Sequence, residues 1–239
     1  MEMTLKRKIV VALAFSIAMA FLESAVVIYL RYLLYPDGFV LPLKEMGDRL
    51  IITELGREVA TVVMLVAAGY MLANNKLSRL AWFLFCFAVW DIFYYVFLYL
   101  ILDWPANILD WDILFLIPVA WFGPVLTPCL VAASMIAFAL IIVSYEHKGA
   151  VRRIRKREWG TMLIGCAVIL YTFIFPFFNY AANAGRVWSL PTAKQLVKES
   201  LSYIPTYYNW PLYGIGLLII WAGIIVYWRR VHNTNAVLY

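Results

Sequence analysis

Two glutamates and an arginine fall close together in an apolar segment of the sequence, at Glu54, Arg57 and Glu58. In a helix these residues share roughly one face, because positions three and four apart are neighbours. A charged residue at the centre of a membrane-spanning helix costs about 2.5–3.5 kcal/mol on insertion scales. These side chains are therefore expected to face other polar groups, a bound cation or a proton rather than lipid.

Two further acids lie at comparable depths in neighbouring apolar segments. The helical rise places Glu23 about 12 Å below the outer end of the first segment, and Glu58 about 13 Å below that of the second. Asp91 lies about 18 Å below the outer end of the third segment, near mid-membrane. Short connections make these three segments neighbours, so the acids are expected to meet in the outer half of a helix bundle.

The candidate site is thus a buried carboxylate and arginine cluster in the outer half of the bundle. Its expected members are Glu23, Glu54, Arg57, Glu58 and Asp91. Accessory candidates are Arg31, Tyr94, Tyr95, Asp110 and Asp112. The acids outnumber the arginines, which leaves negative charge for a proton or a bound cation, with Arg57 as the internal counter-ion.

Two accessory groups have both a structural and a chemical interpretation. Tyr94 and Tyr95 follow Asp91 by three and four residues, so one of them is placed either to donate to its carboxylate or to relay a proton. Asp110 and Asp112 form a DxD pattern that, on the outer side, suits a divalent cation on a phosphate. The better expectation is that Asp112 caps the N-terminus of a following helix, where an acid complements the helix dipole.

Three functional hypotheses follow from the cluster. The favoured one is that the site binds or relays a cation or a proton. The second is that the cluster only fixes helix rotation and register, in a non-catalytic accessory subunit of a larger membrane complex. The third is a metal-dependent membrane enzyme acting on a lipid-linked substrate, with a divalent cation near Asp112. The sequence leaves open whether the protein is an enzyme.

The sequence also argues against several kinds of site. Only His147 and His232 are present, both just beyond the expected inner ends of spans, so the bundle lacks paired axial ligands for a haem b. The sequence contains none of the nucleotide-binding or serine-hydrolase motifs. No cofactor is evident from the sequence, which leaves open whether the protein binds a divalent cation. No basic stripe with stacking aromatics indicates nucleic acid.

The composition is that of an integral membrane protein. Hydrophobic residues make up 65% of the 239 residues and charged residues only 14%, whereas soluble domains are nearer half apolar and a quarter charged. We predict one all-α transmembrane domain over residues 1–239. Six segments are long enough to cross a bilayer, at residues 9–30, 50–73, 80–102, 113–145, 159–178 and 208–228.

Prolines and glycine interrupt the fourth segment. They are Pro118, Gly123, Pro124 and Pro128. Because proline removes a donor and clashes with the preceding turn, we predict a short interfacial helix near 112–121, a break, and a span near 124–145. Pro176 is expected to kink or end the fifth span for the same reason.

Basic residues predict the orientation of the spans. Of the 20 Lys and Arg residues, 13 fall on one side: Lys6, Arg7, Lys8, Lys76, Arg79, Lys148, Arg152, Arg153, Arg155, Lys156, Arg157, Arg229 and Arg230. Since basic loops stay in the cytoplasm, both termini are predicted to be cytoplasmic, in the inner or plasma membrane of the cell.

The long outer loop at residues 179–207 contains one further expected element. Apolar residues recur at helical spacing over 192–204, with charged residues opposite, which predicts a short amphipathic helix on the outer surface. This helix and the apolar spans are the surfaces through which other membrane subunits are expected to bind, beside the contact of the spans with the lipid bilayer.

Overall fold

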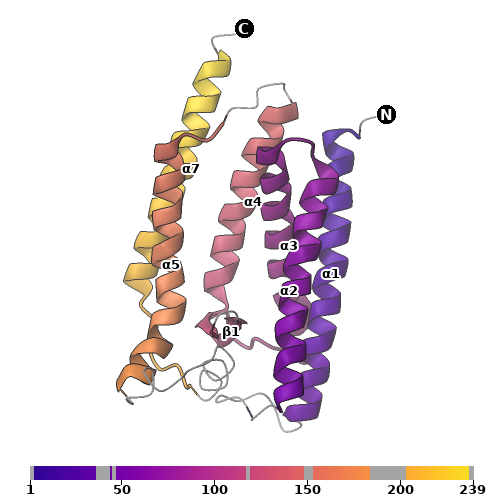
Figure 1. The fold of residues 1–239 in the computed structure, drawn as a ribbon, viewed down its shortest axis with the longest axis vertical. Coiled ribbons are helices and arrows are strands. Elements are labelled where there is room, and N and C mark those ends of the chain that lie inside the picture. Colours follow the sequence, from indigo (N-terminus) through magenta and orange to yellow (C-terminus); the bar gives the residue numbers. More distant parts are fainter. Residues whose placement is uncertain are drawn as a thin grey trace.

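The protein is an antiparallel bundle of long helices with a small β-hairpin at one end (Figure 1). The computed structural model describes residues 3–35, 44, 47–116, 119–147, 153–183 and 203–236. The elements are α1 (Leu5–Leu34), α2 (Asp48–Leu72), α3 (Lys76–Leu102), β1 (Trp111–Phe115), β2 (Trp121–Pro124), α4 (Leu126–His147), α5 (Lys156–Asn183) and α7 (Trp210–Ala236).

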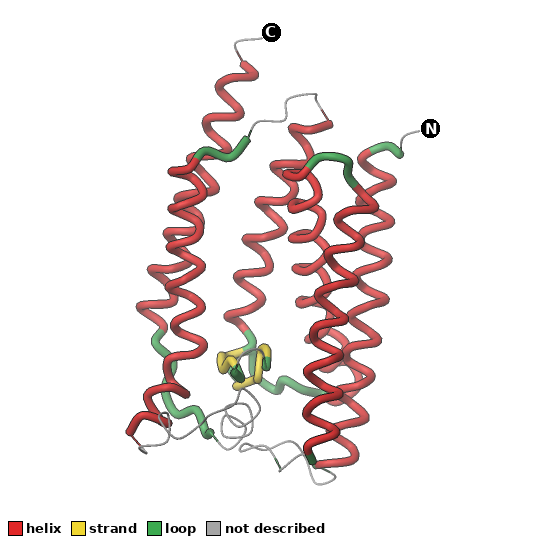
Figure 2. Tube along the Cα trace, viewed as in Figure 1, coloured by secondary structure: helices red, strands yellow, loops and turns green. Residues whose placement is uncertain are grey.

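The helices form two groups. Helix α3 packs against α1, α2 and α4, while α5 and α7 form a close pair that contacts the rest of the bundle through α4 and β2. Helix α1 begins and α7 ends at the same end of the bundle, here called the terminal end. The hairpin lies at the opposite end, called the hairpin end, as Figure 2 shows by its yellow strands.

Among the described residues, five helices are long and apolar enough to cross a membrane, namely α1, α3, α4, α5 and α7. Helix α2 is not among them, and it is the helix that carries Glu54, Arg57 and Glu58. The prediction of a multi-pass helical protein is confirmed at this level. The number of six spans and their orientation stay predictions.

The hairpin corrects the prediction of a short interfacial helix near 112–121. Strands β1 and β2 pair antiparallel, with Asp112 opposite Gly123 and Phe115 opposite Trp121. The rings of Phe115 and Trp121 lie 5.5 Å apart, and such cross-strand aromatic pairs stabilise a sheet. Asp112 therefore does not cap a helix N-terminus. Helix α4 begins only at Leu126.

Local sequence explains the other helix ends. Asn75 caps α3, its side chain accepting a hydrogen bond from the Ser78 N–H at 2.9 Å. Asp103 ends α3 in the left-handed conformation, with φ of 52°. Pro176 lies inside α5 and does not end it, contrary to one of the two expectations for this residue.

Helices α5 and α7 approach closely through small residues. A methyl group on Gly165 would come within 2.7 Å of the backbone oxygen of Gly216. This close contact needs glycine on both helices. The predicted amphipathic helix at 192–204 lies outside the described residues, except for its last two positions.

Candidate functional site

A cavity of about 150 Å³ lies towards the hairpin end of the bundle. Its walls come from α1, α2, α3 and the β1 strand with the residue that follows it. The structure brings all five candidate residues and four of the five accessory candidates to this cavity: Glu23, Glu54, Arg57, Glu58, Asp91, Arg31, Tyr94, Tyr95 and Asp112. Asp110 does not line it and instead accepts a hydrogen bond from the Asn107 N–H at 2.9 Å.

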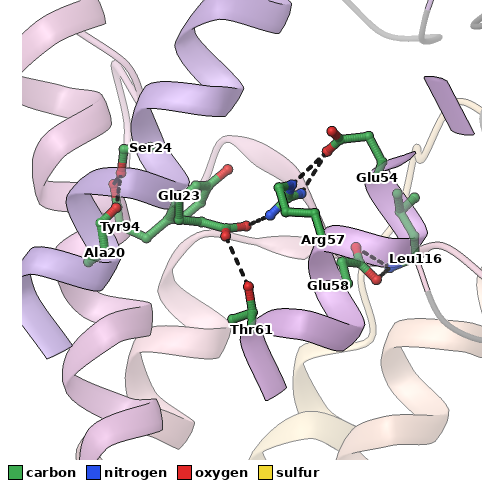
Figure 3. A network of polar contacts seen from close by, with 9 residues as sticks. All are labelled: Ala20, Glu23, Ser24, Glu54, Arg57, Glu58, Thr61, Tyr94 and Leu116. Atoms are coloured by element: carbon green, nitrogen blue, oxygen red, sulfur yellow. Dashed lines mark hydrogen bonds and ion pairs between the residues drawn. The ribbon is translucent and has the colours of Figure 1, made fainter. Parts of the chain in front are cut away.

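Arg57 is the centre of a network that joins α1 and α2 (Figure 3). Its Nη2 lies 2.7 Å from Glu54 Oε2, and its Nε donates to the same oxygen at 2.9 Å. Its Nη1 forms an ion pair with Glu23 across the gap between the two helices. The Thr61 hydroxyl also donates to Glu23, at 3.4 Å. The expected role of Arg57 as counter-ion therefore involves Glu23 and Glu54.

Glu58 has a different partner, which the sequence did not indicate. The backbone N–H of Leu116, just after β1, lies 3.0 and 3.1 Å from the two carboxylate oxygens of Glu58. Glu58 is only 7% exposed, so a buried acid of α2 holds the end of a hairpin strand in place. This contact anchors the hairpin over the cavity.

Arg31 and Asp112 form a second, looser pair. Their nearest side-chain atoms are 4.0 Å apart, and the Arg31 guanidinium also lies 3.8 Å over the ring of Trp104. Burial raises the pKa of Asp112 above its ordinary value, while the Arg31 charge and hydrogen bonds from the Ile113 backbone and Tyr95 oppose that rise. Asp112 Oδ2 has no hydrogen-bond partner within the described residues.

Asp91 lies outside the network of ion pairs and hydrogen bonds around Arg57. It lines the cavity and is half-buried, yet no ion pair or side-chain hydrogen bond joins it to another residue that the structure describes. The expected hydrogen bond from Tyr94 or Tyr95 is not formed. The hydroxyl group of Tyr95 donates its hydrogen bond to Asp112 instead. Asp91 is therefore an unpaired carboxylate on the wall of a cavity.

The charges around the cavity do not balance. Among the described residues, the lining holds the five carboxylates of Glu23, Glu54, Glu58, Asp91 and Asp112 against the two guanidiniums of Arg31 and Arg57, a formal charge of −3. The described part of the chain holds no group of three or more His, Cys, Asp or Glu side chains that could hold a metal ion. The acids surround the cavity without converging on one point.

Sequence reasoning missed three contributors to this site. Thr61 and the Leu116 N–H bind two of the glutamates, and Trp90 lines the cavity with an indole Nε1 that has no partner among the described residues. Trp90 directly precedes Asp91, so its position was visible in the sequence. Its contact with the cavity was not, because α3 carries many aromatic residues and the sequence does not single out one of them.

No family model, no curated protein and no solved structure matches this chain in the comparisons. Its function must therefore be argued from the site itself.

Proposed function

We propose that the cavity at the hairpin end binds a positively charged ligand or carries a proton. The proposal includes six membrane spans with both termini in the cytoplasm of the inner or plasma membrane, so that the cavity lies in the outer half. One observation carries it: Asp91 and one oxygen of Asp112 have no partner among the residues that the structure describes, in a cavity whose described lining has a formal charge of −3.

Physical cost supports this interpretation over a purely structural one. An isolated buried carboxylate is so unfavourable that it takes up a proton or acquires a partner. Arg57 satisfies Glu23 and Glu54, and the Leu116 N–H satisfies Glu58. A network whose only role was to hold three helices together would be complete with these contacts. Asp91 adds a charge that this role does not require.

Thermal unfolding of the full chain in detergent tests the proposal. The unfolding temperature is recorded against increasing Na⁺, K⁺, Mg²⁺, Ca²⁺ and small organic ammonium ions at constant ionic strength, and separately against pH. A ligand that binds only the folded state raises the unfolding temperature in proportion to ln(1 + [L]/Kd). At least one cation, or the proton, is expected to stabilise the wild type in a saturable way.

A matched pair of variants assigns the effect to the cavity. Asp91→Asn removes the unpaired charge while keeping the shape, and it is expected to abolish the stabilisation. Asp103→Asn changes an exposed acid at a left-handed position, where asparagine is tolerated. This variant is expected to keep the stabilisation. If no cation and no pH change distinguishes wild type from Asp91→Asn, the proposal fails and the cluster is a structural network.

The two other hypotheses, a metal-dependent enzyme and an accessory subunit, predict different features. A metal-dependent enzyme needs a divalent cation near Asp112, and the described residues supply no set of three metal-binding side chains there. An accessory subunit predicts stoichiometric partners on purification and no response of the acids to cations. No contact in the described residues favours either one, so each is an outcome of the same titration.

A further inference from the structure

The wall of the cavity around Asp91 is aromatic as well as acidic. Trp90, Tyr94 and Tyr95 line the cavity with Asp91, and the last two lie three and four residues beyond it in α3. The rings of Tyr94 and Tyr95 are 4.9 Å apart. Helix α3 thus gives one cavity a carboxylate that has no partner among the described residues and three aromatic rings, whose faces are negative.

This combination selects among positively charged ligands. Na⁺, Ca²⁺ and Mg²⁺ require about six or more oxygen ligands or several retained waters, and the described residues offer no group of three convergent acids or histidines. An organic ammonium ion needs only one counter-charge and is attracted to the faces of Trp and Tyr rings. The arginine at the same end already shows this contact, since the Arg31 guanidinium lies 3.8 Å over Trp104.

Two unpaired buried atoms indicate what else the ligand carries. Asp112 Oδ2 is an acceptor and Trp90 Nε1 is a donor, neither has a hydrogen-bond partner within the described residues, and both residues line the cavity. Their parent residues are 5% and 7% exposed. Buried polar atoms of this kind are ordinarily paired. A ligand with an N–H or O–H group and an oxygen would satisfy both atoms.

The volume limits the size of the ligand. An apolar cavity of about 150 Å³ holds a molecule the size of benzene, and the cavity here has about the same volume. We propose that the cavity binds a small organic ammonium ion of roughly four to ten non-hydrogen atoms, with Asp91 as its counter-ion and Trp90, Tyr94 and Tyr95 on the same cavity wall. This inference rests on the proposed function and specifies its ligand class.

The ammonium group has two sources, a free amine in solution or the head group of a phospholipid. Calorimetric titration of the full chain in nanodiscs of phosphatidylglycerol, which lacks an ammonium group, measures ethanolammonium, choline and tetramethylammonium against NaCl of equal ionic strength. Saturable binding of at least one ammonium ion and none of Na⁺ is expected. A second set of nanodiscs containing phosphatidylethanolamine identifies the head group as the source if the free ligand then binds about tenfold or more weakly.

Variants test the two halves of the recognition. Asp91→Asn is expected to weaken binding by about tenfold or more, because it removes the carboxylate of the aromatic wall that has no partner among the described residues. Tyr94→Leu is expected to weaken it by about three- to tenfold, while Tyr94→Phe, which keeps the ring, leaves it near the wild-type value. Asp103→Asn serves as the control that changes an acid outside the cavity.

The outcomes separate this inference from the proposed function. If protons or Na⁺ bind with dependence on Asp91 and the ammonium ions do not, the ligand class is wrong and the cation site stands. If ammonium ions bind equally to wild type and Asp91→Asn, the assigned position is wrong. If Tyr94→Phe and Tyr94→Leu weaken binding equally, the aromatic contribution is wrong. If nothing binds and nothing titrates, both proposals fall.

Discussion

Two arginine and carboxylate clusters lie at opposite ends of the bundle, and they differ in charge balance. At the terminal end, Glu158 of α5 is 3% exposed and accepts hydrogen bonds from Arg230 of α7 at 2.6 and 2.7 Å. The backbone N–H of Arg155 adds a third contact at 2.8 Å. One acid meets one base, and both oxygens of the acid are satisfied. At the hairpin end, five acids face two arginines around a cavity.

The difference shows what a purely structural cluster looks like in this protein. The Glu158 and Arg230 pair joins two helices, both oxygens of the acid accept hydrogen bonds, and the nearby Arg155 adds positive rather than negative charge. The contacts of Arg57 with Glu23 and Glu54 join α1 and α2 in the same way. Within the described part of the chain, Asp91 and one oxygen of Asp112 go beyond that pattern, so the removal of these two groups should have a different effect.

The largest expected effect is loss of the counter-ion at the hairpin end. Arg57→Met leaves the buried Glu54 and the partly buried Glu23 without their counter-ion, and breaking a buried pair by removing one member costs about 3–5 kcal/mol of stability. Chemical unfolding in detergent measures the change in free energy. Arg49→Met is the matched control, because Arg49 is exposed on the same helix, and it is expected to change stability by less than about 0.5 kcal/mol. Equal effects of the two variants would contradict the network.

The second effect tests the balanced cluster. Glu158→Gln keeps the shape of the side chain but removes the carboxylate charge that faces Arg230 and weakens the hydrogen bonds between them, so a loss of about 2 kcal/mol is expected. The same unfolding measurement applies. Glu146→Gln is the control on α4, since its carboxylate is only partly buried and binds the Asn75 amide rather than an arginine. A neutral Glu158→Gln would mean that this pair does not stabilise the bundle.

The third prediction applies the same change of acid to amide at Asp91, where it is expected to increase stability rather than to reduce it. Asp91→Asn removes a charge that has no partner, so it is expected to raise the free energy of unfolding by about 1 kcal/mol in the absence of ligand. A loss as large as that of Glu158→Gln would show that Asp91 is paired in the folded protein. The comparison between the two ends of the bundle would then lose its basis.

The sequence was sufficient to predict the main helices and the meeting of the acids. Apolar length and proline positions placed each predicted span within a few residues of a helix, and helical rise put Glu23 and Glu58 at one depth, where the structure has both on one cavity. These features depend on local periodicity, which a single sequence contains. The ion pair of Arg57 with Glu54 is of the same local kind, since the two residues are three positions apart.

The sequence was insufficient where a contact depends on distant chain segments. Residues 113–125 carry no charged side chain, and short apolar stretches between prolines suit a buried strand as well as a helix, so the hairpin was predicted as a helix. The partner of Glu58 was missed as a consequence, because it is the N–H of Leu116 beside that hairpin. Glu158 and Arg230 are 72 residues apart and share no local pattern.

The smallest expected effect is the contribution of Asp112 to the pH dependence of stability. Burial raises the pKa of Asp112 in the folded protein above its ordinary value, and Arg31 only partly opposes this. An acid whose folded pKa is raised is protonated more readily in the folded state. Its contribution to stability is therefore full below the ordinary pKa of an aspartic acid and is lost as the pH rises through the raised value.

Asp112→Asn should remove this part of the pH dependence. Between the ordinary pKa of an aspartic acid and the raised pKa of Asp112, the free energy of unfolding of the wild type is expected to fall relative to that of the variant as the pH rises. At higher pH the difference between the two proteins is expected to be constant. Asp91, Arg31 and Tyr95 remain around the position in both proteins, so their own titration largely cancels in the difference. The same difference for Asp103→Asn should be flat. A wild type that gains stability relative to Asp112→Asn with rising pH would show that Arg31 outweighs burial, and that the second pair is as balanced as the one at the terminal end.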